Sequence, residues 1–413
     1  MIPLRLDEVA ALAAGRLTTA PGVDQVTGVK VDSRRVERGD LFVAVGDGAE
    51  FVEDALARGA AATLVPDEPF AAMAALGRAV RDRSSARVVG ITGSTGKTST
   101  KDILAALCAP SAVTVAAEAS YNNEIGVPLT LCRLEPETEV CILELAMRGF
   151  GQIAELSEIA RPEIGVVTNV GPAHLELVGS LEGVLRAKGE LVAALPPGGT
   201  AIVPEEFPVE RDDIEVVRLG QPELNVEDGR AVVGGVSFNF TSSHQAANAA
   251  TALAALDALE LPRPDRVDVE FSRWRGEELP LAGGGVLVND AYNANPISMR
   301  AALADLAERA GDRRRVAILG DMAELGSAAI AFHVEIGEEA ARSGVGALLA
   351  VGELARGYLD GAHGVPVTRW APDAHAAVSA AEEVVEPGDC VLVKASRAVG
   401  LEVVAEALAA VRA

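Results

Sequence analysis

The sequence has few of the residues that characterise extracellular or membrane proteins. Its only cysteines are Cys108, Cys132, Cys141 and Cys390; none forms a CxxC pair, and three of them lie inside apolar runs. This usage predicts a reduced, cytoplasmic protein without a disulfide framework. The N-terminus lacks a basic segment followed by an apolar stretch, and no apolar run reaches the roughly 20 residues that span a bilayer. A signal peptide and a membrane-spanning helix are therefore not expected.

Positive charge is also scarce, because 36 Lys and Arg residues stand against 60 Asp and Glu residues and give a net charge of −24. That excess of acid opposes non-specific attraction to nucleic acid or to an anionic membrane. Among the basic residues, lysine is the rarer type. A lysine kept against an arginine-rich background is either chance or a sign that an amine is required, since a guanidinium differs in shape and reactivity. The five lysines are Lys30, Lys97, Lys101, Lys188 and Lys394.

The composition that remains is typical of a folded protein with several domains. Of the 413 residues, 49% are hydrophobic and 23% are charged, so the chain has ample material for a core. Strand-like and helix-like segments alternate along most of the chain, which favours α/β domains with largely parallel sheets. A polar stretch over Arg81–Arg87 is predicted to be a linker, and 214–240 has β character. We predict three consecutive α/β domains, over residues 1–84, 85–274 and 275–413.

The most informative local segment is VVGITGSTGKTSTKDILAAL, in which an apolar strand runs into a glycine-bounded turn that opens a helix. In such a loop the backbone N–H groups and the helix N-terminus surround phosphate oxygens. Lys97 is expected to reach the β- and γ-phosphates, and the hydroxyl of Thr98 to bind Mg²⁺. The spacing departs from GxxxxGK[ST], because the nearest glycines are Gly90 and Gly93. ATP binding is predicted, as in many kinases, ATPases and ligases.

Three polar residues follow neighbouring strands of the same predicted domain. Glu144 ends the apolar strand VCILE, His174 lies in the loop after the next strand, and Lys188 lies on the following helix. The carboxyl ends of parallel strands are where α/β sheets bind their ligands. An uncharged lysine amine can react with CO₂ to form a carbamate, an anionic oxygen ligand of the kind that Mg²⁺ prefers, whereas arginine cannot. These residues therefore predict a metal and nucleotide site beside the phosphate loop.

Together these residues resemble those of the Mur ligase family of ATP-dependent amide ligases, and within it the MurF branch. The resemblance rests on motifs in all three predicted domains, and it runs from about Asp32 to the C-terminus. They are VDSRRVERGDLFVAV (31–45), TGSTGKTST (92–100), YNNEIGVPLTL (121–131), HLELVGSLEGVLRAKGEL (174–191), NDAYNANPISMRAAL (289–303), RVAILGDMAELG (315–326) and VLVKASRAVGLE (391–402).

The resemblance implies a role for each domain, with a C-terminal domain that is Rossmann-like. The first domain would hold the UDP end of the substrate, the central P-loop-type domain would bind ATP and Mg²⁺, and the third would bring the incoming amino compound. The residues implied as catalytic are Lys97, Lys188, His174 and Glu144. Those implied for ATP are Gly93, Ser94, Thr95, Gly96, Lys97, Thr98, Ser99, Asn248, Arg275 and Asp290, with His244 on the same helical face as Asn248. Those implied for the other substrates are Ser33, Arg34, Asn123, Asn293, Asn295, Lys394, Ser396 and Arg397. Two Mg²⁺ ions would be held by Thr98, Glu144, His174 and a carbamylated Lys188.

The implied reaction is the joining of D-alanyl-D-alanine to UDP-N-acetylmuramoyl-tripeptide through an acyl phosphate, in peptidoglycan synthesis. The implied partners are these small molecules, without nucleic acid or membrane insertion, and the implied state is a monomer. Three alternatives stay open from the sequence: another amide ligase of the same family, a folate polyglutamate ligase, and a catalytically silent nucleotide-binding protein. The tripeptide-forming branch usually carries a DNPR-type motif, which this sequence lacks.

Overall fold

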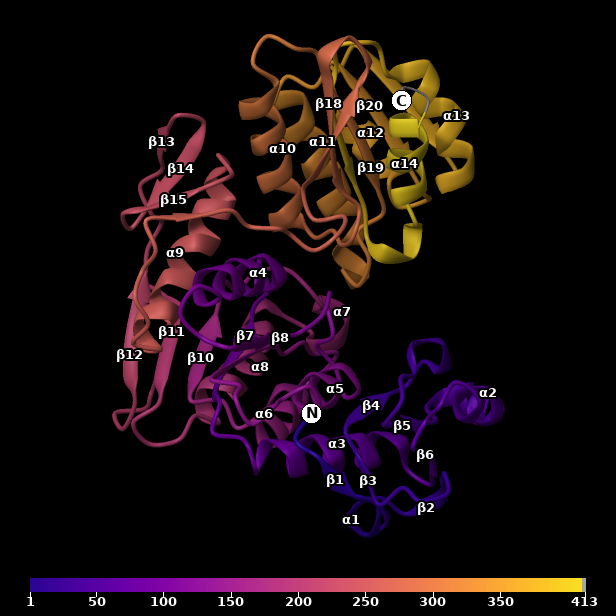
Figure 1. Ribbon diagram of the computed structural model, residues 1–413. Coiled ribbons are helices and arrows are strands. Elements are labelled where there is room, and N and C mark those ends of the chain that lie inside the picture. The colour runs from indigo at the N-terminus through magenta and orange to yellow at the C-terminus, as the bar shows by residue number, and fades with distance from the viewer. Residues whose placement is uncertain (411–413) are drawn as a thin grey trace.

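A computed structural model describes residues 1–410 of the chain, and it contains three α/β units that follow one another in the sequence (Figure 1). We call them the N-terminal, central and C-terminal units, after their order in the chain. The predicted α/β class with three consecutive domains is confirmed. The boundaries at residues 84/85 and 274/275 stay a prediction, and residues 411–413 of the predicted third domain lie outside the described residues.

The N-terminal unit is a four-stranded sheet with the strand order β2-β6-β5-β4, in which β2 is antiparallel to β6 and the other pairs are parallel. Outside this sheet, β1 and β3 form a separate two-stranded antiparallel ribbon. The strands are β1 Leu4–Arg5, β2 Gly15–Thr19, β3 Gln25–Val26, β4 Gly28–Lys30, β5 Asp40–Val43 and β6 Ala62–Pro66. The helices are α1 Leu6–Leu12, α2 Val52–Ala57 and α3 Pro69–Arg81, with 3₁₀ turns η1 Ser33–Arg35 and η2 Gly46–Phe51.

The central unit is a six-stranded, fully parallel sheet in the order β12-β11-β10-β7-β9-β8. β8 and β9 lie on one side of β7, and β10, β11 and β12 lie on the other. The strand order therefore reverses at β7, and open α/β sheets bind their ligands at such a reversal. Its strands are β7 Arg87–Thr92, β8 Thr114–Ala116, β9 Val140–Glu144, β10 Ile164–Val167, β11 Thr200–Pro204 and β12 Glu215–Leu219. Its helices are α4 Lys97–Cys108, α5 Gly126–Leu131, α6 Gln152–Ala160, α7 Leu175–Val178, α8 Leu181–Ala193 and α9 Ser243–Ala258.

A small sheet extends the central unit and confirms the β character predicted for 214–240. Its order is β13-β14-β15-β16, and its apolar face packs in the same core as α4 and α9. The strands are β13 Asn225–Glu227, β14 Arg230–Val233, β15 Val236–Phe238 and β16 Arg266–Val267.

The C-terminal unit is a second six-stranded sheet, in the order β17-β18-β22-β19-β20-β21. Only β17 is antiparallel to its neighbour. One face is covered by α10, α11 and α12, and the other by α13 and α14. The strands are β17 Glu277–Leu281, β18 Gly285–Asp290, β19 Arg315–Gly320, β20 Ala347–Val351, β21 Val367–Ala371 and β22 Cys390–Lys394. The helices are α10 Pro296–Ala310, α11 Ala329–Arg342, α12 Arg356–Gly361, α13 Ala374–Val384 and α14 Glu402–Ala410, with 3₁₀ turns η3 Ala282–Gly284, η4 Gly326–Ala328 and η5 Arg397–Val399.

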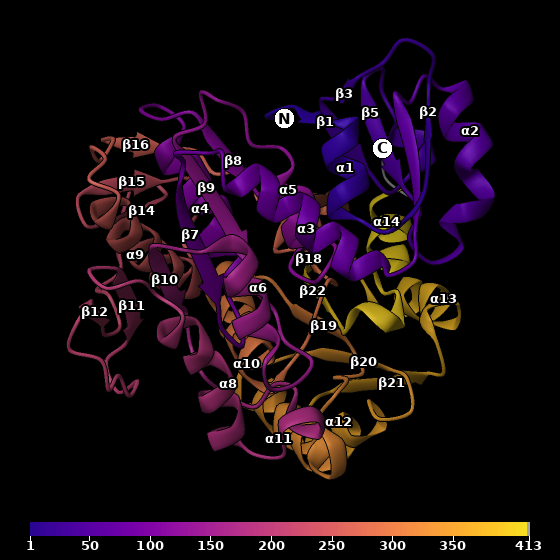
Figure 2. The same cartoon turned by 90° about the horizontal axis from the view of Figure 1, so that it is seen from below.

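The N-terminal and central units share one apolar core through α3, which lies beside α5 (Figure 2). The two helices approach so closely that a Cβ on Gly77 would lie 2.8 Å from Cα of Pro128. The predicted linker over Arg81–Arg87 is therefore partly wrong. Arg81 ends α3 and is buried, and its guanidinium donates to the carbonyl of Ala160 over 3.0 Å. Only the residues between Arg81 and Arg87 connect the helix to β7.

All four cysteines are buried and unpaired within the described chain. Among residues 1–410, no helix combines the length and the apolar character that a membrane crossing requires.

Candidate functional site

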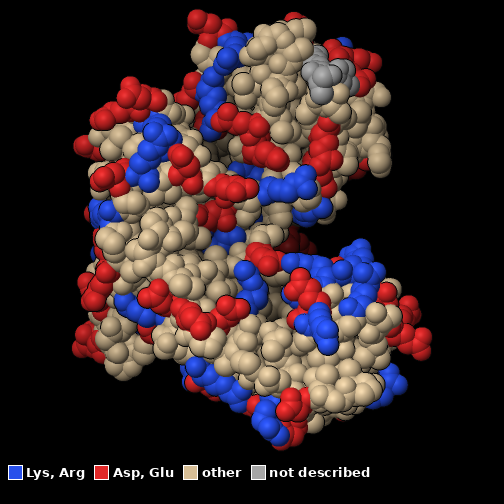
Figure 3. Space-filling view, in the orientation of Figure 1, with Lys and Arg blue, Asp and Glu red and all other residues tan. Residues whose placement is uncertain are grey.

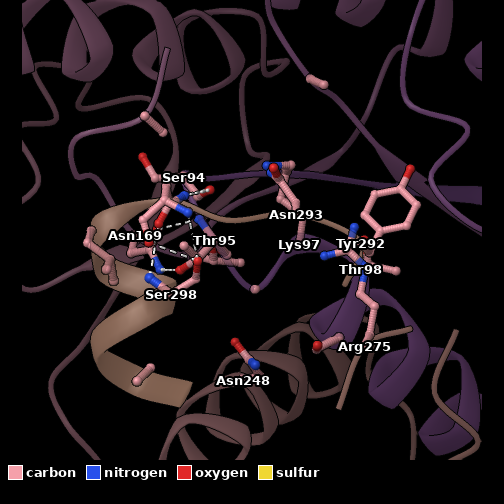
Figure 4. A pocket seen from close by; sticks show the side chains of 18 of the residues that line it. Ser94, Thr95, Lys97, Thr98, Asn169, Asn248, Arg275, Tyr292, Asn293 and Ser298 are labelled. Carbon is pink, nitrogen blue, oxygen red and sulfur yellow. Dashed lines mark hydrogen bonds between the residues drawn. The ribbon is translucent and has the colours of Figure 1, made fainter. Parts of the chain in front are cut away.

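A cleft of about 790 Å³ lies between the central and C-terminal units, and residues from both line it. Figure 3 shows a hollow between the upper and lower parts of the molecule, with basic side chains at its rim. Figure 4 shows that side chains of the loop after β7, of α9 and of the C-terminal unit point toward the same space. Most of the residues predicted for ATP and for the incoming dipeptide therefore meet in one place.

The loop between β7 and α4 requires glycine at both ends. Gly96 has φ = +79°, and a Cβ there would lie 2.4 Å from Oδ1 of Asn248. Gly93 has φ = +153°, and a Cβ there would lie 1.8 Å from Oγ1 of Thr168. Any larger residue would push the loop away from α9 and from β10. The backbone N–H groups at the start of α4 are thereby held at the edge of the cleft, where they can surround an anion.

A residue that the sequence reasoning did not single out holds this loop from the side. Oδ1 of Asn169, directly after β10, accepts the backbone N–H of Thr95 over 2.9 Å. The neighbouring Thr168 donates from Oγ1 to the carbonyl of Thr95 over 2.6 Å. Asn169 lies in the same loop as His174, but nothing in the sequence indicated that its side chain bonds to the phosphate loop.

Lys97 is half-buried at the start of α4, where its Nζ donates to the carbonyl of Gly93 over 2.6 Å. Burial, together with the nearby positive charge of Arg275, lowers the pKa of Lys97 to about 8, and the charge of Glu144 only partly opposes this shift. A buried ammonium without full compensation is stabilised when an anion binds beside it. The site is therefore suited to a phosphate group.

Thr98 and Glu144 lie next to each other beneath the loop. Oγ1 of Thr98 is 3.2 Å from Oε2 of Glu144, and the glutamate is fully buried. Its other oxygen, Oε1, has no hydrogen-bond partner among the described residues, and Nζ of Lys101 lies 3.9 Å from it. A buried carboxylate oxygen without a donor is costly unless a cation satisfies it, so these two residues fit a hard cation. Within residues 1–410 no three His, Cys, Asp or Glu side chains are grouped as metal ligands, so such a cation would need further ligands of another kind.

Lys188 is buried in α8, with 1% of its surface exposed. Burial and the nearby charge of Lys97 lower the pKa of Lys188 well below its ordinary value. No carboxylate of the described residues lies within 4.0 Å of its amine. The amine therefore has a reason to be uncharged, as a reaction with CO₂ requires. Neither Lys188 nor Glu144 is among the residues that line the open cleft.

His174 precedes α7 and lines the cleft. Its Nδ1 lies 2.5 Å from Oε2 of Glu324, which belongs to the C-terminal unit. This contact holds the pKa of Glu324 below its ordinary value, although burial opposes the shift. Glu324 lies in the motif GDMAELG, but its pairing with a residue 150 positions away had no signal in a single sequence.

Arg275 lines the cleft just before β17, the first strand of the C-terminal unit. Its Nη2 donates to Oγ of Ser120 over 3.1 Å, and its guanidinium lies 4.1 Å from the ring centre of Tyr292. Ser120 is also 3.5 Å from Oγ1 of Thr98. The hydroxyl of Ser120, which the sequence reasoning missed, thus connects Arg275 with the Thr98 and Glu144 pair.

The remaining cleft residues of the C-terminal unit come from the loops after β18 and β22. Nζ of Lys394 pairs with Oδ2 of Asp290 over 2.5 Å and donates to the carbonyl of Asn293 over 2.8 Å. Nδ2 of Asn295 donates to the carbonyl of Ser94 over 3.2 Å. Ser396 and Arg397 line the same wall. The predicted dipeptide residues are therefore grouped opposite the phosphate loop.

His244 and Asn248 lie on α9 at the other end of the cleft. Nδ2 of Asn248 donates to Oε1 of Gln245 over 3.0 Å. Nδ1 of His244 is buried and has no partner among residues 1–410, and burial lowers the pKa of this histidine. Both polar atoms of the Asn248 side chain thus have protein partners, since its Oδ1 also lies 3.5 Å from Oγ1 of Thr100.

Comparison with known proteins decides the family. Models of the Mur ligase middle domain and of the Mur ligase, glutamate ligase domain match residues 91–256 and 274–397. The UDP-N-acetylmuramoyl-tripeptide--D-alanyl-D-alanine ligase of Mycobacterium tuberculosis H37Rv is 36% identical, in an alignment that covers 99% of this chain and 98% of that protein. The Escherichia coli K12 protein of the same name is 34% identical, over 86% of this chain and 87% of that protein. The chain belongs to the Mur ligase family.

Solved structures agree with this membership and with its MurF branch. A crystal structure of MurF from Acinetobacter baumannii has a TM-score of 0.86 and 26% identity, over 99% of each chain. The MurF ligase of Thermotoga maritima, solved in complex with ADP, has a TM-score of 0.78 and 26% identity, over 93% of this chain and 97% of that chain. The fold and branch expected from the motifs are therefore confirmed for this Mur ligase.

Two residues predicted for the UDP end lie apart from the cleft of this Mur ligase. Ser33 and Arg34 belong to η1 of the N-terminal unit and are not among the residues that line the cleft. Arg34 pairs with Asp32 over 2.8 Å, and 80% of its side chain is exposed. The neighbouring Arg35, which was not predicted, faces the central unit instead, where Nη2 lies 2.9 Å from Oε2 of Glu118.

Asn123 lines the cleft as predicted, but its Oδ1 already accepts the backbone N–H of Gly126 over 2.9 Å. Its side-chain oxygen therefore shapes the turn before α5, and its amide nitrogen is the group left for a substrate. Ser99 lies in the first turn of α4 behind Thr98 and lines the cleft with it.

Proposed function

We propose that this Mur ligase joins D-alanyl-D-alanine to UDP-N-acetylmuramoyl-tripeptide at the expense of ATP, forming ADP and phosphate. The observation that carries the proposal is the meeting of a phosphate loop with the Asp290, Asn293, Asn295 and Lys394 group across one cleft. A nucleotide and an amino compound bound on these opposite walls would face each other. The full-length relatives, which bear the name of this activity, support the choice of substrates.

The nucleotide would lie along the loop 93–99. Lys97, the N–H groups at the start of α4 and the guanidinium of Arg275 provide positive charge for the triphosphate. Asn248 offers an amide at the far end of the cleft, where we place the adenine, with His244 beside it. Asp290, held by Lys394, is placed near the ribose.

Magnesium fits beside this triphosphate. Thr98 and Glu144 would hold one ion, with phosphate oxygens as further ligands, because the unpartnered Oε1 of Glu144 needs a cation. His174 and Lys188, the latter as a carbamate, would hold a second ion. When bound, Mg²⁺ neutralises developing charge on the transferring phosphoryl group.

The chain's own residues would carry the chemistry by positioning. Lys97 and Arg275 would draw charge from the γ-phosphoryl group, so that the terminal carboxylate of the tripeptide attacks phosphorus and ADP leaves. The amine of D-alanyl-D-alanine would then attack the acyl phosphate carbon, lose a proton, and expel inorganic phosphate. Asn293, Asn295, Ser396 and Arg397 would orient this dipeptide, and the two facing units would exclude water that competes with the amine.

The decisive assay mixes purified protein with ATP, Mg²⁺, UDP-N-acetylmuramoyl-tripeptide and D-alanyl-D-alanine. Phosphate release is expected only when both acceptor and dipeptide are present, and the product should gain the mass of the dipeptide. Phosphate release without either substrate, or with a single amino acid in place of the dipeptide, would contradict the proposal. The monomeric state and the cytoplasmic location stay predictions of the sequence.

A further inference from the structure

The segment that carries His174 contacts Glu324 through one side-chain bond and one backbone bond, which join the central and C-terminal units. Nδ1 of His174 lies 2.5 Å from Oε2 of Glu324, and the backbone N–H of Glu176 donates to the carbonyl of Glu324 over 3.3 Å. The start of α7 in the central unit is therefore docked on the loop that follows β19 in the C-terminal unit.

Both partners have backbone conformations that side chains other than glycine rarely adopt. φ is +56° at His174 and +62° at Glu324. Such a backbone conformation is strained for a residue with a side chain, and it persists only where the surroundings hold it. Gly326 has φ = +59°, and a Cβ there would lie 3.6 Å from Glu176, so the two segments pack at backbone distance. The pair is therefore held in place by its local backbone.

Glu324 is fixed to its own unit by the residues that precede it. Three consecutive residues each bond to a different element of the C-terminal unit, so the carboxylate moves with that unit as a rigid body. The bonds run from Ala355 N to Asp321 Oδ1 (2.7 Å), from Met322 N to His333 Nε2 (3.0 Å), and from Ala323 N to Ser396 Oγ (2.9 Å).

The energy of the pair itself is modest. The side chains of His174 and Glu324 are 22% and 46% exposed. A hydrogen bond or ion pair between side chains this exposed contributes little to stability. The value of the contact therefore lies in the geometry that it imposes on a histidine of the cleft.

We propose that Glu324 is a positioning residue that sets the orientation and the tautomer of His174, and that it does so only while the C-terminal unit is docked. A carboxylate at Nδ1 accepts the ring proton, so a neutral imidazole keeps its lone pair on Nε2. Nε2 is then the nitrogen available to the cleft. Because Glu324 belongs to the opposite unit, His174 is set for the reaction only when the two walls of the cleft have met.

The first test observes the tautomer directly and needs no activity. The protein is labelled with ¹⁵N-histidine, and the ring nitrogen shifts are recorded at a pH where free histidine is neutral. His174→Gln identifies the signal of His174. We expect the Nδ1–H form in the native protein and a shift toward the Nε2–H form in Glu324→Ala, whereas Glu382→Gln, an exposed change on α13, leaves the signal unchanged. Unaltered signals of the other four histidines show that the fold is intact. An unchanged His174 signal in Glu324→Ala overturns the proposal.

The second test rests on the proposed ligase function. Loss of a residue that orients a ligand typically costs 10–100-fold, so Glu324→Ala is expected to lower kcat by about that factor with little change in KM for the dipeptide. Glu324→Gln keeps an acceptor oxygen and should recover part of the loss. In a His174→Ala background, Glu324→Ala should have no further effect on kcat. If the double variant instead lowers kcat by the product of the two separate factors, Glu324 acts independently of His174. An inactive native protein would refute the ligase function instead, and the tautomer would still decide the role of Glu324.

Discussion

The side-chain amide of Asn295 donates from Nδ2 to the backbone carbonyl of Ser94 over 3.2 Å, although the two residues lie 201 positions apart. Oδ1 of the same side chain accepts the backbone N–H of Ser298 over 3.0 Å and caps α10. One asparagine thus starts a helix of the C-terminal unit and docks that helix on the phosphate loop. The third unit is in this way positioned against the nucleotide site.

Replacing Asn295 by aspartate separates these two roles. Asp is as good a helix cap as Asn, so Asn295→Asp should keep the cap on α10, although a buried carboxylate that faces the Ser94 carbonyl should lower the free energy of unfolding. It has no N–H for the Ser94 carbonyl and brings a negative charge toward the triphosphate. We expect kcat of the ligase reaction to fall by about 10-fold or more, the effect of losing roughly 1.4 kcal/mol of transition-state stabilisation.

Asn295→Ala should lose the cap as well, and cost about 1 kcal/mol of stability in urea denaturation. Asp373 caps α13 by accepting the backbone N–H of Ala376 over 2.8 Å, away from the cleft. Asp373→Ala is therefore the matched control, with a similar loss of stability and native kcat. Native kcat in Asn295→Asp would show that the contact with Ser94 has no part in the reaction.

Glycine at position 96 should be essential for nucleotide binding. Gly96→Ala forces a Cβ to within 2.4 Å of Asn248 at φ = +79°. The left-handed backbone alone costs about 1–2 kcal/mol, and relief of the clash moves the loop or the amide of Asn248. We expect affinity for ADP, measured by calorimetry, to fall at least about 10-fold. Gly189→Ala, in α8 with no atom within 4 Å of its new Cβ, is the control and should bind ADP normally. Equal affinity in both variants would contradict this account of the loop.

Lys188 should be needed as a reactive amine and not as a charge. We expect Lys188→Ala to lower kcat by at least about 100-fold, since loss of a metal ligand costs no less than loss of the residues that support one. Added short carboxylates should restore part of the activity by replacing the carbamate. Lys188→Arg supplies a fixed positive charge but cannot form a carbamate, and it should stay inactive with or without them.

The control for Lys188 is Lys30→Arg, because Lys30 only approaches Asp40, at 3.9 Å on the N-terminal unit. That variant should keep native activity. Full activity in Lys188→Arg would refute the carbamate. So would the combination of two results: no 44 Da adduct in mass spectra of the intact protein under bicarbonate, and no rescue of Lys188→Ala by carboxylates.

The sequence was sufficient for residues whose type alone determines their chemistry. The loop around Lys97, the carboxylate at the end of β9 and the buried lysine of α8 were all predicted, since strand, turn and helix patterns determine their positions locally. Contacts between units had no such local signal. The bond from Asn295 to Ser94 and the pair of His174 with Glu324 depend on how two sheets dock, which no spacing in one chain records.

Burial was the other property that the sequence reported poorly. The polar stretch over Arg81–Arg87 predicts a linker, yet Arg81 is buried and bonded to the carbonyl of Ala160. Its carbon stem packs while its guanidinium satisfies backbone carbonyls, as long basic side chains often do.

His333 should make the C-terminal unit sensitive to acid. It is fully buried, its Nε2 accepts the backbone N–H of Met322 over 3.0 Å, and its Nδ1 lies 2.6 Å from the carbonyl of Ala329. Burial lowers the pKa of His333, although the Ala329 carbonyl and Asp321 oppose the shift. Below about pH 6.5 the histidine is protonated in the unfolded chain but stays neutral in the folded chain. The free energy of unfolding should therefore fall as pH drops below about 6.5, by up to about 1.4 kcal/mol per pH unit.

The measurement compares urea denaturation at about pH 8 and about pH 5.5, on either side of the ordinary histidine pKa. His333→Gln removes the titrating group, so it should be less stable than the native protein at the higher pH but lose less stability on acidification. His375→Gln makes the same change at an exposed position of α13 and should keep the native pH dependence. If His333→Gln loses as much stability as the native protein between the two pH values, the acid sensitivity arises elsewhere. If only His333→Gln weakens the pH dependence, the acid sensitivity arises at His333, beneath the loop that carries Glu324. Protonation of Nε2 would then remove the acceptor of the Met322 N–H in that loop.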